Sequence, residues 1–339
     1  MNYYTDIQNE YTEIFNESWN AAINHQFFTH KLYAYGNRMR PLIVLGGYLA
    51  SRTTINITRE EMRQVAELSV SIELIHKASL ILDDMIDNDV ARHGNQSFHA
   101  SYGNGNTIMF ALYTISKSFQ RINEIIAQLP KDHMLANIGM KLMCDITEKM
   151  SFGELLELNL DKKSKSTPQV IQQIIDLETS SIIFRSLQLG YYLGNGRNLK
   201  VSQTFEEIGK ECGYIFQVMN DLEPFCNERQ YFFHKGNMST DYISSKKNIA
   251  ICLLLNTISK SEKKNLENKE LSIQEINKLI IHYFEVYHIK DTFMRDVDTI
   301  HKKIGQQIQS LTDYGINAEW CDVFNEFINR VVQECNARL

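Results

Sequence analysis

Asp83, Asp84 and Asp87 lie within five consecutive residues, and Arg92 follows five residues later. On a helix the positions i, i+1 and i+4 are neighbours, so the three carboxylates repel one another unless a cation keeps them ionised. Hard carboxylate oxygens with no cysteine or histidine among them favour Mg²⁺ over zinc. The planar guanidinium of Arg92 offers paired donors to a phosphate oxygen. The segment therefore predicts a metal-assisted diphosphate site.

A long amphipathic helix is predicted to position these aspartates. A mostly apolar stripe recurs in steps of three and four through residues 65–86 and runs directly into the acidic cluster. The alternative is a solvated acidic helix end. Because the carboxylates emerge from a buried stripe, we favour a metal site that lines a cavity.

A second helix, predicted over about residues 204–224, carries another group of polar side chains. Gly209 and Gly213 form a small-residue groove, although glycines in helices more often mark close packing than a ligand site. The candidate residues on and after this helix are Phe216, Gln217, Asn220, Asp221, Glu223 and Glu228, with Lys235 and Lys246 further along.

Composition and periodicity place these helices in an all-α chain. Nearly every segment of the 339 residues has helical spacing, with only 4 prolines and no evident hairpin. The breaks, among them an irregular piece at 227–245, are short, so one domain over 1–339 is predicted, with a motif-bearing core at about 30–255 and C-terminal helices at 256–339.

Composition also excludes several classes of function. The net charge of −6 and the dispersed basic residues argue against a nucleic-acid surface. No signal-peptide pattern begins the chain, and the longest apolar runs are too short to span a bilayer. The 6 cysteines include no CxxC pair and predict reduced thiols, which indicates a cytoplasmic location.

Four segments, in order, resemble the trans-isoprenyl diphosphate synthase (polyprenyl synthetase) family. Residues 73–87 (ELIHKASLILDDMID), followed by Arg92-His93-Gly94, resemble its first aspartate-rich motif. Residues 36–41 (GNRMRP) resemble its GKRLRP segment, and residues 216–223 (FQVMNDLE) resemble its second aspartate-rich motif. Lys235, Asp241 and Lys246 resemble the lysine-rich stretch that follows.

The resemblance implies an isoprenoid synthase bundle of helices around a deep apolar cavity, and a homodimer. It implies that an allylic prenyl diphosphate binds through three Mg²⁺ ions, held by the aspartates of the first motif and by Asn220, Asp221, Glu223 and Glu228. Diphosphate-binding roles fall on Arg92, Gln217, Lys235 and Lys246, and catalytic roles on Asp83, Asp84, Asp87 and Asp221. Phe216 is expected to face the carbocation.

The chain departs from the family where isopentenyl diphosphate binds. Arg40 and His76 match that pocket, but Asn37 stands at its lysine and His93 at its second arginine. Glu178 replaces the lysine of a Lys-Thr pair, and Pro224 occupies the last acidic position of the second motif. Losing charge-assisted contacts weakens diphosphate binding. These changes favour intramolecular capture of the cation, as in a terpene synthase, or a non-standard acceptor.

Two alternatives remain open: an ordinary chain-elongating prenyltransferase with a weakened pocket, and a non-catalytic subunit of a heteromeric enzyme. The intact aspartates argue against the second. Ala78 and Ser79, the fifth and fourth residues before Asp83, are small where short-chain members of the family often carry an aromatic. A deeper pocket, suited to a C15–C20 allylic chain, is therefore expected.

Overall fold

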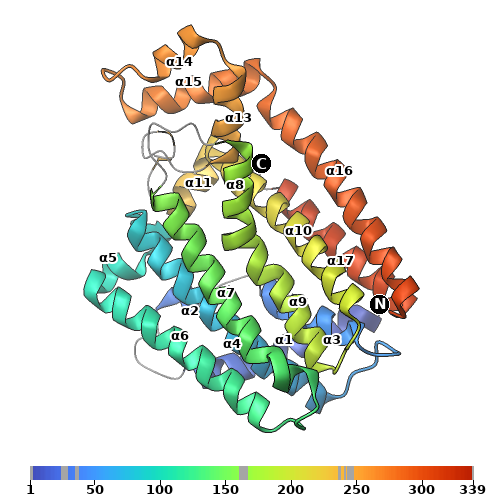
Figure 1. The fold of residues 1–339 in the computed structure, drawn as a ribbon. Helices are drawn as coiled ribbons and strands as arrows, with labels where there is room; N and C mark the ends of the chain where they lie inside the picture. The colour runs from blue at the N-terminus through green and yellow to red at the C-terminus, as the bar shows by residue number, and fades with distance from the viewer. Residues whose placement is uncertain are drawn as a thin grey trace.

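The computed structural model shows helices packed as one bundle, which confirms the predicted all-α fold (Figure 1). It describes residues 3–23, 30–34, 38–159, 167–235, 238–239, 242 and 248–337, without the side chains of 3, 4, 32, 34, 230, 233 and 234. Buried apolar residues from both ends of the chain belong to one hydrophobic cluster. Among the described helices, none combines the length and apolar character needed to cross a bilayer.

The first half of the bundle is built from the following elements: α1 (Tyr3–Ala22), α2 (Lys31–Ala34), α3 (Met39–Ala50), α4 (Arg59–Ile86), β1 (Ala91–Arg92), β2 (Asn95–Gln96), α5 (Phe98–Tyr102), α6 (Asn104–Ala127) and α7 (Met134–Asn159). The second half comprises α8 (Pro168–Ile175), the π-helix η2 (Asp176–Ser180), α9 (Ser181–Leu193), α10 (Leu199–Cys226), α11 (Glu228–Lys235), α13 (Ile249–Thr257), α14 (Lys260–Leu266), α15 (Ile273–Val286), α16 (Ile289–Ser310), the 3₁₀-helix η3 (Leu311–Tyr314) and α17 (Ala318–Asn336).

Helix α4 is the predicted amphipathic helix, 28 residues long. It begins with a capping box, in which the Thr58 hydroxyl accepts from the Glu61 backbone N–H and the Glu61 carboxylate accepts from the Thr58 backbone N–H. Leu68, Ile72 and other residues of its apolar stripe are fully buried. Burying this stripe against the bundle fixes which face of α4 is left for the aspartates at its C-terminal end.

A two-strand hairpin follows α4 directly, although the sequence shows no hairpin pattern. Ala91 pairs with Gln96 and Arg92 with Asn95, and the turn residues His93 and Gly94 both have positive φ angles. Two positive φ angles are typical of a type I′ turn. Strands of two residues are too short to show alternating hydrophobicity, so the sequence did not reveal them. The helix α11 likewise occupies a stretch, residues 227–245, that was expected to be irregular.

Helices α9 and α10 approach each other closely because of two glycines. A Cβ built on Gly209 would lie 2.4 Å from the Phe184 Cβ, and one built on Gly213 would lie 2.1 Å from the Ser180 Oγ. Such distances leave no room for a side chain. The groove at Gly209 and Gly213 is therefore a helix-packing surface, which is the simpler of the two readings of the sequence.

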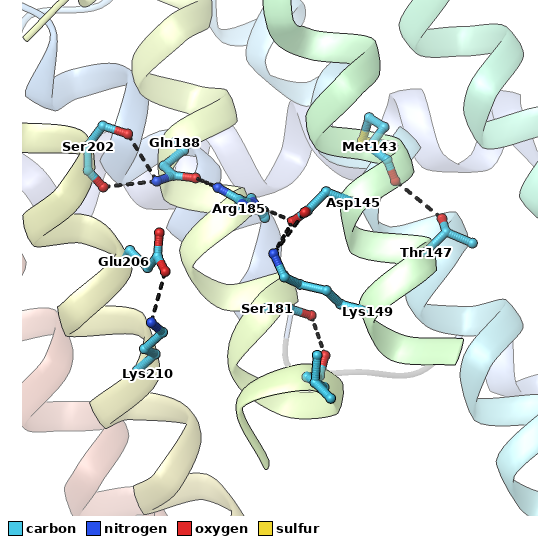
Figure 2. A network of polar contacts seen from close by, with 11 residues as sticks. Met143, Asp145, Thr147, Lys149, Ser181, Arg185, Gln188, Ser202, Glu206 and Lys210 are labelled. Atoms are coloured by element: carbon cyan, nitrogen blue, oxygen red, sulfur yellow. Dashed lines mark hydrogen bonds and ion pairs between the residues drawn. The ribbon is translucent and has the colours of Figure 1, made fainter. Parts of the chain in front are cut away.

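A polar network joins α7, α9 and α10 on another side of α9 (Figure 2). Asp145 on α7 accepts from Lys149 Nζ at 2.8 and 2.7 Å and from Arg185 Nε at 2.7 Å. Arg185 also donates to Gln188 at 2.6 Å, and Gln188 donates to the Ser202 carbonyl at 2.9 Å. Burial raises the pKa of Asp145, but the bonds from Arg185 and Lys149 outweigh it and lower that pKa. The network therefore holds α9 between its two neighbours.

Replacing Gly213 by alanine is expected to lower the free energy of unfolding by about 2 kcal/mol, because the new Cβ overlaps the Ser180 backbone. Gly105 is the matched control. A Cβ on Gly105, which is also helical, meets nothing within 4 Å, so Gly105→Ala is expected to be neutral or slightly stabilising. Urea denaturation of both variants measures the difference. Equal stabilities would contradict the packing role of Gly213.

Candidate active site

The centre of the site is a buried ion pair between the end of α4 and the hairpin. Asp84 is 0% exposed, and both of its carboxylate oxygens accept from Arg92 Nε at 2.8 Å. Arg92 Nη2 also donates to Asp83 Oδ2 at 3.0 Å. Among the described residues, Arg92 Nη1 has no hydrogen-bond partner. One guanidinium therefore holds two of the three aspartates and keeps a nitrogen available for an anionic ligand.

Mutual electrostatics keep this pair charged. Burial raises the pKa of Asp84, while Arg92 and Lys235 oppose that shift. Burial would lower the pKa of Arg92, but Asp84, Asp83 and Asp89 together raise it. Arg92 therefore stays protonated, and it supplies the cation that the neighbouring carboxylates require.

Asp83 and Asp87 are placed differently from Asp84. The Asp83 side chain is 43% exposed and Asp87 is half-buried, so both present oxygens to solvent one helical turn apart. Two hard carboxylate oxygens of this kind fit Mg²⁺. Within the described part of the chain, no three His, Cys, Asp or Glu side chains are grouped closely enough to hold one metal ion.

Lys235 connects the first motif to the helices of the second. It lies on α11, which directly follows α10 and packs against β1. Its Nζ forms an ion pair with Asp89 and lies 4.0 Å from Asp84 Oδ1. Two segments about 150 residues apart therefore meet at the end of α4, with carboxylates and cations interleaved.

Asp221 and Gln217 on α10 form a second ordered group. Asp221 is 7% exposed; its Oδ1 accepts from Gln217 Nε2 at 2.7 Å, and its Oδ2 accepts from the Ile249 backbone N–H at 2.6 Å. The Gln217 Oε1 accepts from Thr179 Oγ1 at 3.0 Å. Thr179 belongs to the π-helix η2, a feature that often marks functional sites. Asp221 thus joins η2 and α10 to the N-terminus of α13.

The other metal-ligand candidates of the second motif have different surroundings. Asn220 is exposed, whereas Glu223 is 5% exposed. Glu228 is exposed and lines a pocket of about 310 Å³ together with Asn277 and other residues of α15, and the lining of this pocket includes no residue of the first motif. Pro224 lies inside α10, which ends two residues later at Cys226.

The predicted isopentenyl diphosphate pocket is only partly described. His76 has a pKa well below its ordinary value because of burial and then of Arg40, Lys77 and Arg92, so it is neutral at neutral pH. Arg40 Nε is buried without a hydrogen-bond partner among the described residues. His93 is exposed in the hairpin turn. Asn37 and Lys246 lie outside the described residues.

The residues predicted to line the prenyl chain differ in their surroundings. Ala78 is fully buried, and Ser79 is half-buried with its hydroxyl donating to the His76 carbonyl at 2.8 Å. Phe216 lines a narrow apolar pocket of about 20 Å³ between α3, α9, α10 and α17, and neither Ala78 nor Ser79 belongs to its lining.

Comparison with known proteins agrees with this arrangement. The polyprenyl synthetase family model matches residues 22–282. The chain belongs to the polyprenyl synthetase family. It is 23% identical over 255 residues to the short chain isoprenyl diphosphate synthase of Methanocaldococcus jannaschii, covering 74% of this chain and 73% of that protein. It is 24% identical over 253 residues to the geranylgeranyl diphosphate synthase of Saccharolobus solfataricus, with 74% and 73% covered.

Solved structures of polyprenyl synthetases share the fold. The polyprenyl synthase from Caulobacter crescentus, complexed with calcium and isoprenyl diphosphate, superposes with a TM-score of 0.79. The alignment covers 96% of this chain and 95% of that one, at 16% sequence identity. The heptaprenyl diphosphate synthase from Staphylococcus aureus gives a TM-score of 0.78 at 18% identity, with 96% and 98% covered.

Two charged residues of the site were not singled out from the sequence. Asp89, 6% exposed, is the partner of Lys235, and Glu73, 3% exposed, is a buried carboxylate on α4. Each is an acid within a helical turn or two of a motif residue, but acids at such positions are usually solvated. What distinguishes them from solvated acids is their long-range contacts, of Asp89 with α11 and of Glu73 with Arg38 before α3.

Removing the arginine of the buried pair is expected to destabilise the fold. Arg92→Leu leaves Asp84 buried with only the more distant Lys235, so the free energy of unfolding should fall by about 3 kcal/mol. The double variant Arg92→Leu with Asp84→Asn removes both charges and should recover most of this loss. Urea denaturation of the two single variants and the double variant forms the cycle. Additive effects would contradict the pairing.

Proposed function

We propose that this polyprenyl synthetase is a chain-elongating prenyltransferase, which ionises an allylic prenyl diphosphate and joins it to isopentenyl diphosphate. The observation that carries the proposal is the contact of Lys235 with the carboxylates beside Arg92, which brings the two motif-bearing parts of the chain to one place. The names of the relatives from M. jannaschii and S. solfataricus, both diphosphate synthases, agree with it.

The proposed roles follow from exposure and bonding. Mg²⁺ would be held by Asp83 and Asp87 on one wall and by Asn220 on the other, because their oxygens face solvent. The buried Asp84 and Asp221 would orient their neighbours instead. Bound Mg²⁺ supplies positive charge that stabilises the departing diphosphate. Arg92 and Lys235 bind its oxygens. The allylic C–O bond breaks, the isopentenyl double bond attacks the cation, and the adduct loses a proton.

A second candidate is intramolecular capture of the cation, as in a terpene synthase. The departures at Asn37 and His93 favour it, since Asn37 removes a full positive charge from the family's acceptor pocket and His93 carries one only when protonated. Elongation is preferred here because Arg40, which acts electrostatically on His76, keeps a positive charge in that pocket.

The proposed allylic substrate carries a C15–C20 chain. Ala78 is fully buried and small, and Ser79 bonds back to its own helix, so neither projects an aromatic ring across the path of the chain. The length of the allylic chain stays a prediction from these two positions.

Incubation with Mg²⁺ and geranyl, farnesyl or geranylgeranyl diphosphate, with and without isopentenyl diphosphate, tests the reaction. Longer diphosphates are expected only when isopentenyl diphosphate is present. Hydrocarbons or alcohols formed without it would establish the second candidate. Asp83→Ala should lower kcat about a thousandfold by removing a metal ligand, while Asp313→Ala, an exposed acid on η3, should not change it. Absence of turnover under all conditions would indicate a non-catalytic subunit.

We also propose that the chain forms a homodimer through α6, which lies at the outer edge of the bundle (Figure 1). Four large apolar residues on neighbouring positions of this helix are exposed: Ile108 at 41%, Met109 at 61%, Leu112 at 54% and Tyr113 at 40%. An exposed apolar stripe of this kind is typical of an interaction surface.

Introducing a charge into this stripe should dissociate the dimer. Leu112→Glu buries an unpaired carboxylate in the proposed interface and should raise the dimer dissociation constant at least about a hundredfold. Thr299→Glu, an exposed position on α16 outside this stripe, is the matched control. Sedimentation of both variants measures the change. A monomeric wild-type protein would contradict the proposal.

A further inference from the structure

A buried cluster with more cations than carboxylates lies on the side of α4 that faces the start of α3. Glu73 and Lys77 are each 3% exposed, and the Lys77 Nζ lies 3.6 Å from Glu73 Oε1. The Arg38 Nη1 lies 3.7 Å from the same oxygen. Arg40 is also within electrostatic reach of Glu73. Among the described residues, the Glu73 cluster therefore contains three cations and one carboxylate.

Two guanidinium nitrogens of the Glu73 cluster form no hydrogen bond with the described part of the chain. Among the described residues, Arg38 Nη1 and Arg40 Nε are buried without a hydrogen-bond partner. The Arg38 guanidinium is held in place, because it stacks 5.4 Å from the Phe15 ring centroid and 5.1 Å from that of Trp19. Burying more positive than negative charge is unfavourable, so an anionic ligand would complete the described part of the cluster.

The position of the Glu73 cluster fits the second diphosphate of the proposed reaction. His76, next to Lys77, experiences the charges of Arg40, Lys77 and Arg92 together. It precedes Asp83 by seven residues, which is about 10 Å along a helix. An anion bound here would therefore lie beside the metal-binding carboxylates without occupying their place.

We infer that Lys77 is a specificity-determining residue that supplies to the acceptor diphosphate the positive charge missing at Asn37 and His93. The inference rests on the proposed elongation function. Arg38, the residue that follows Asn37 in the chain, approaches the same Glu73 oxygen as Lys77. Lys77, on α4, thus supplies a positive charge that the family has at the position of Asn37. It restores one of the two lost charges, in a cluster that also contains Arg38.

The charge of Lys77 also gives the acceptor site a pH dependence. Among the described residues, the charged groups that act on Lys77 include Glu73 on its own helix, Arg38 before α3 and Arg40 in α3, while the adjacent His76 is neutral. Burial, and then Arg38 and Arg40, lower the pKa of Lys77 to about 8 against the opposing effect of Glu73. Lys77 is charged below this pH and neutral above it. The value of kcat/KM for the acceptor should therefore fall as the pH rises through about 8.

The test replaces the charge but keeps the length of the side chain. Lys77→Met should raise the KM for isopentenyl diphosphate about 10- to 100-fold, with little change in the KM for the allylic substrate, and should remove the alkaline limb of the acceptor profile. Lys149→Met is the matched control, since Lys149 also pairs with a carboxylate four residues earlier, Asp145. It should leave both KM values unchanged.

Restoring the family's lysine provides the decisive variant. Asn37→Lys in the Lys77→Met background should return the acceptor KM to within about threefold of wild type. An unchanged acceptor KM in Lys77→Met, an equal rise in both KM values, or no rescue would overturn the inference. Should Lys77→Met not fold, the wild-type pH profile decides, because a profile flat between pH 7 and 9 would equally overturn it.

Failure of the proposed function can be told apart from failure of this inference. Wild-type turnover without isopentenyl diphosphate would end the elongation proposal. Binding of inorganic pyrophosphate to the Mg²⁺-free protein, measured by calorimetry, tests the Glu73 cluster independently of turnover. Weaker binding to Lys77→Met than to Lys149→Met supports an anion site at Lys77, and equal binding overturns it.

Discussion

The buried pair between Asp84 and Arg92 is the interaction on which the rest of the site depends. Asp84 closes the last turn of α4, and Arg92 belongs to the first strand of the hairpin, so their contact folds the hairpin back onto the helix that precedes it. Lys235 of α11 approaches the same pair, with its Nζ 4.0 Å from Asp84 Oδ1. Without the charge of Arg92, Asp83, Asp84 and Asp89 would repel one another, and Lys235 would be the cation left beside Asp84 and Asp89.

Charges of opposite sign predominate at two levels along α4, one around Glu73 and one at its C-terminal end. Near Glu73 the cations outnumber the carboxylates, whereas from Asp83 to Asp89 the carboxylates are grouped around Arg92 and Lys235. Each level therefore favours a ligand of the opposite sign: an anion at the first, a divalent cation at the second. Because both levels are carried by one rigid helix, the spacing between the two ligands is set by the helix itself rather than by loops.

The sequence was sufficient for the fold class, for α4 with its buried stripe, and for the proximity of Asp83, Asp84 and Arg92, since all three depend on local periodicity and spacing. It did not separate buried Asp84 from exposed Asp83, because the difference depends on where Arg92 returns. It also missed the hairpin and α11, which local patterns encode weakly. The role of Glu73 requires contacts from a different segment of the chain and is not visible in any single motif.

The substitutions at Asn37 and His93 therefore have to be judged by the charge of the whole pocket rather than by position. An unpaired lysine can follow its ligand on its flexible four-carbon side chain, whereas Lys77 is fixed by α4 and by its pair with Glu73. Such a fixed charge loses less entropy on binding but tolerates fewer ligand positions. A charge held in a more rigid frame would bind one placement of the acceptor diphosphate and discriminate against others, so the departure from the family pattern changes selectivity as well as affinity.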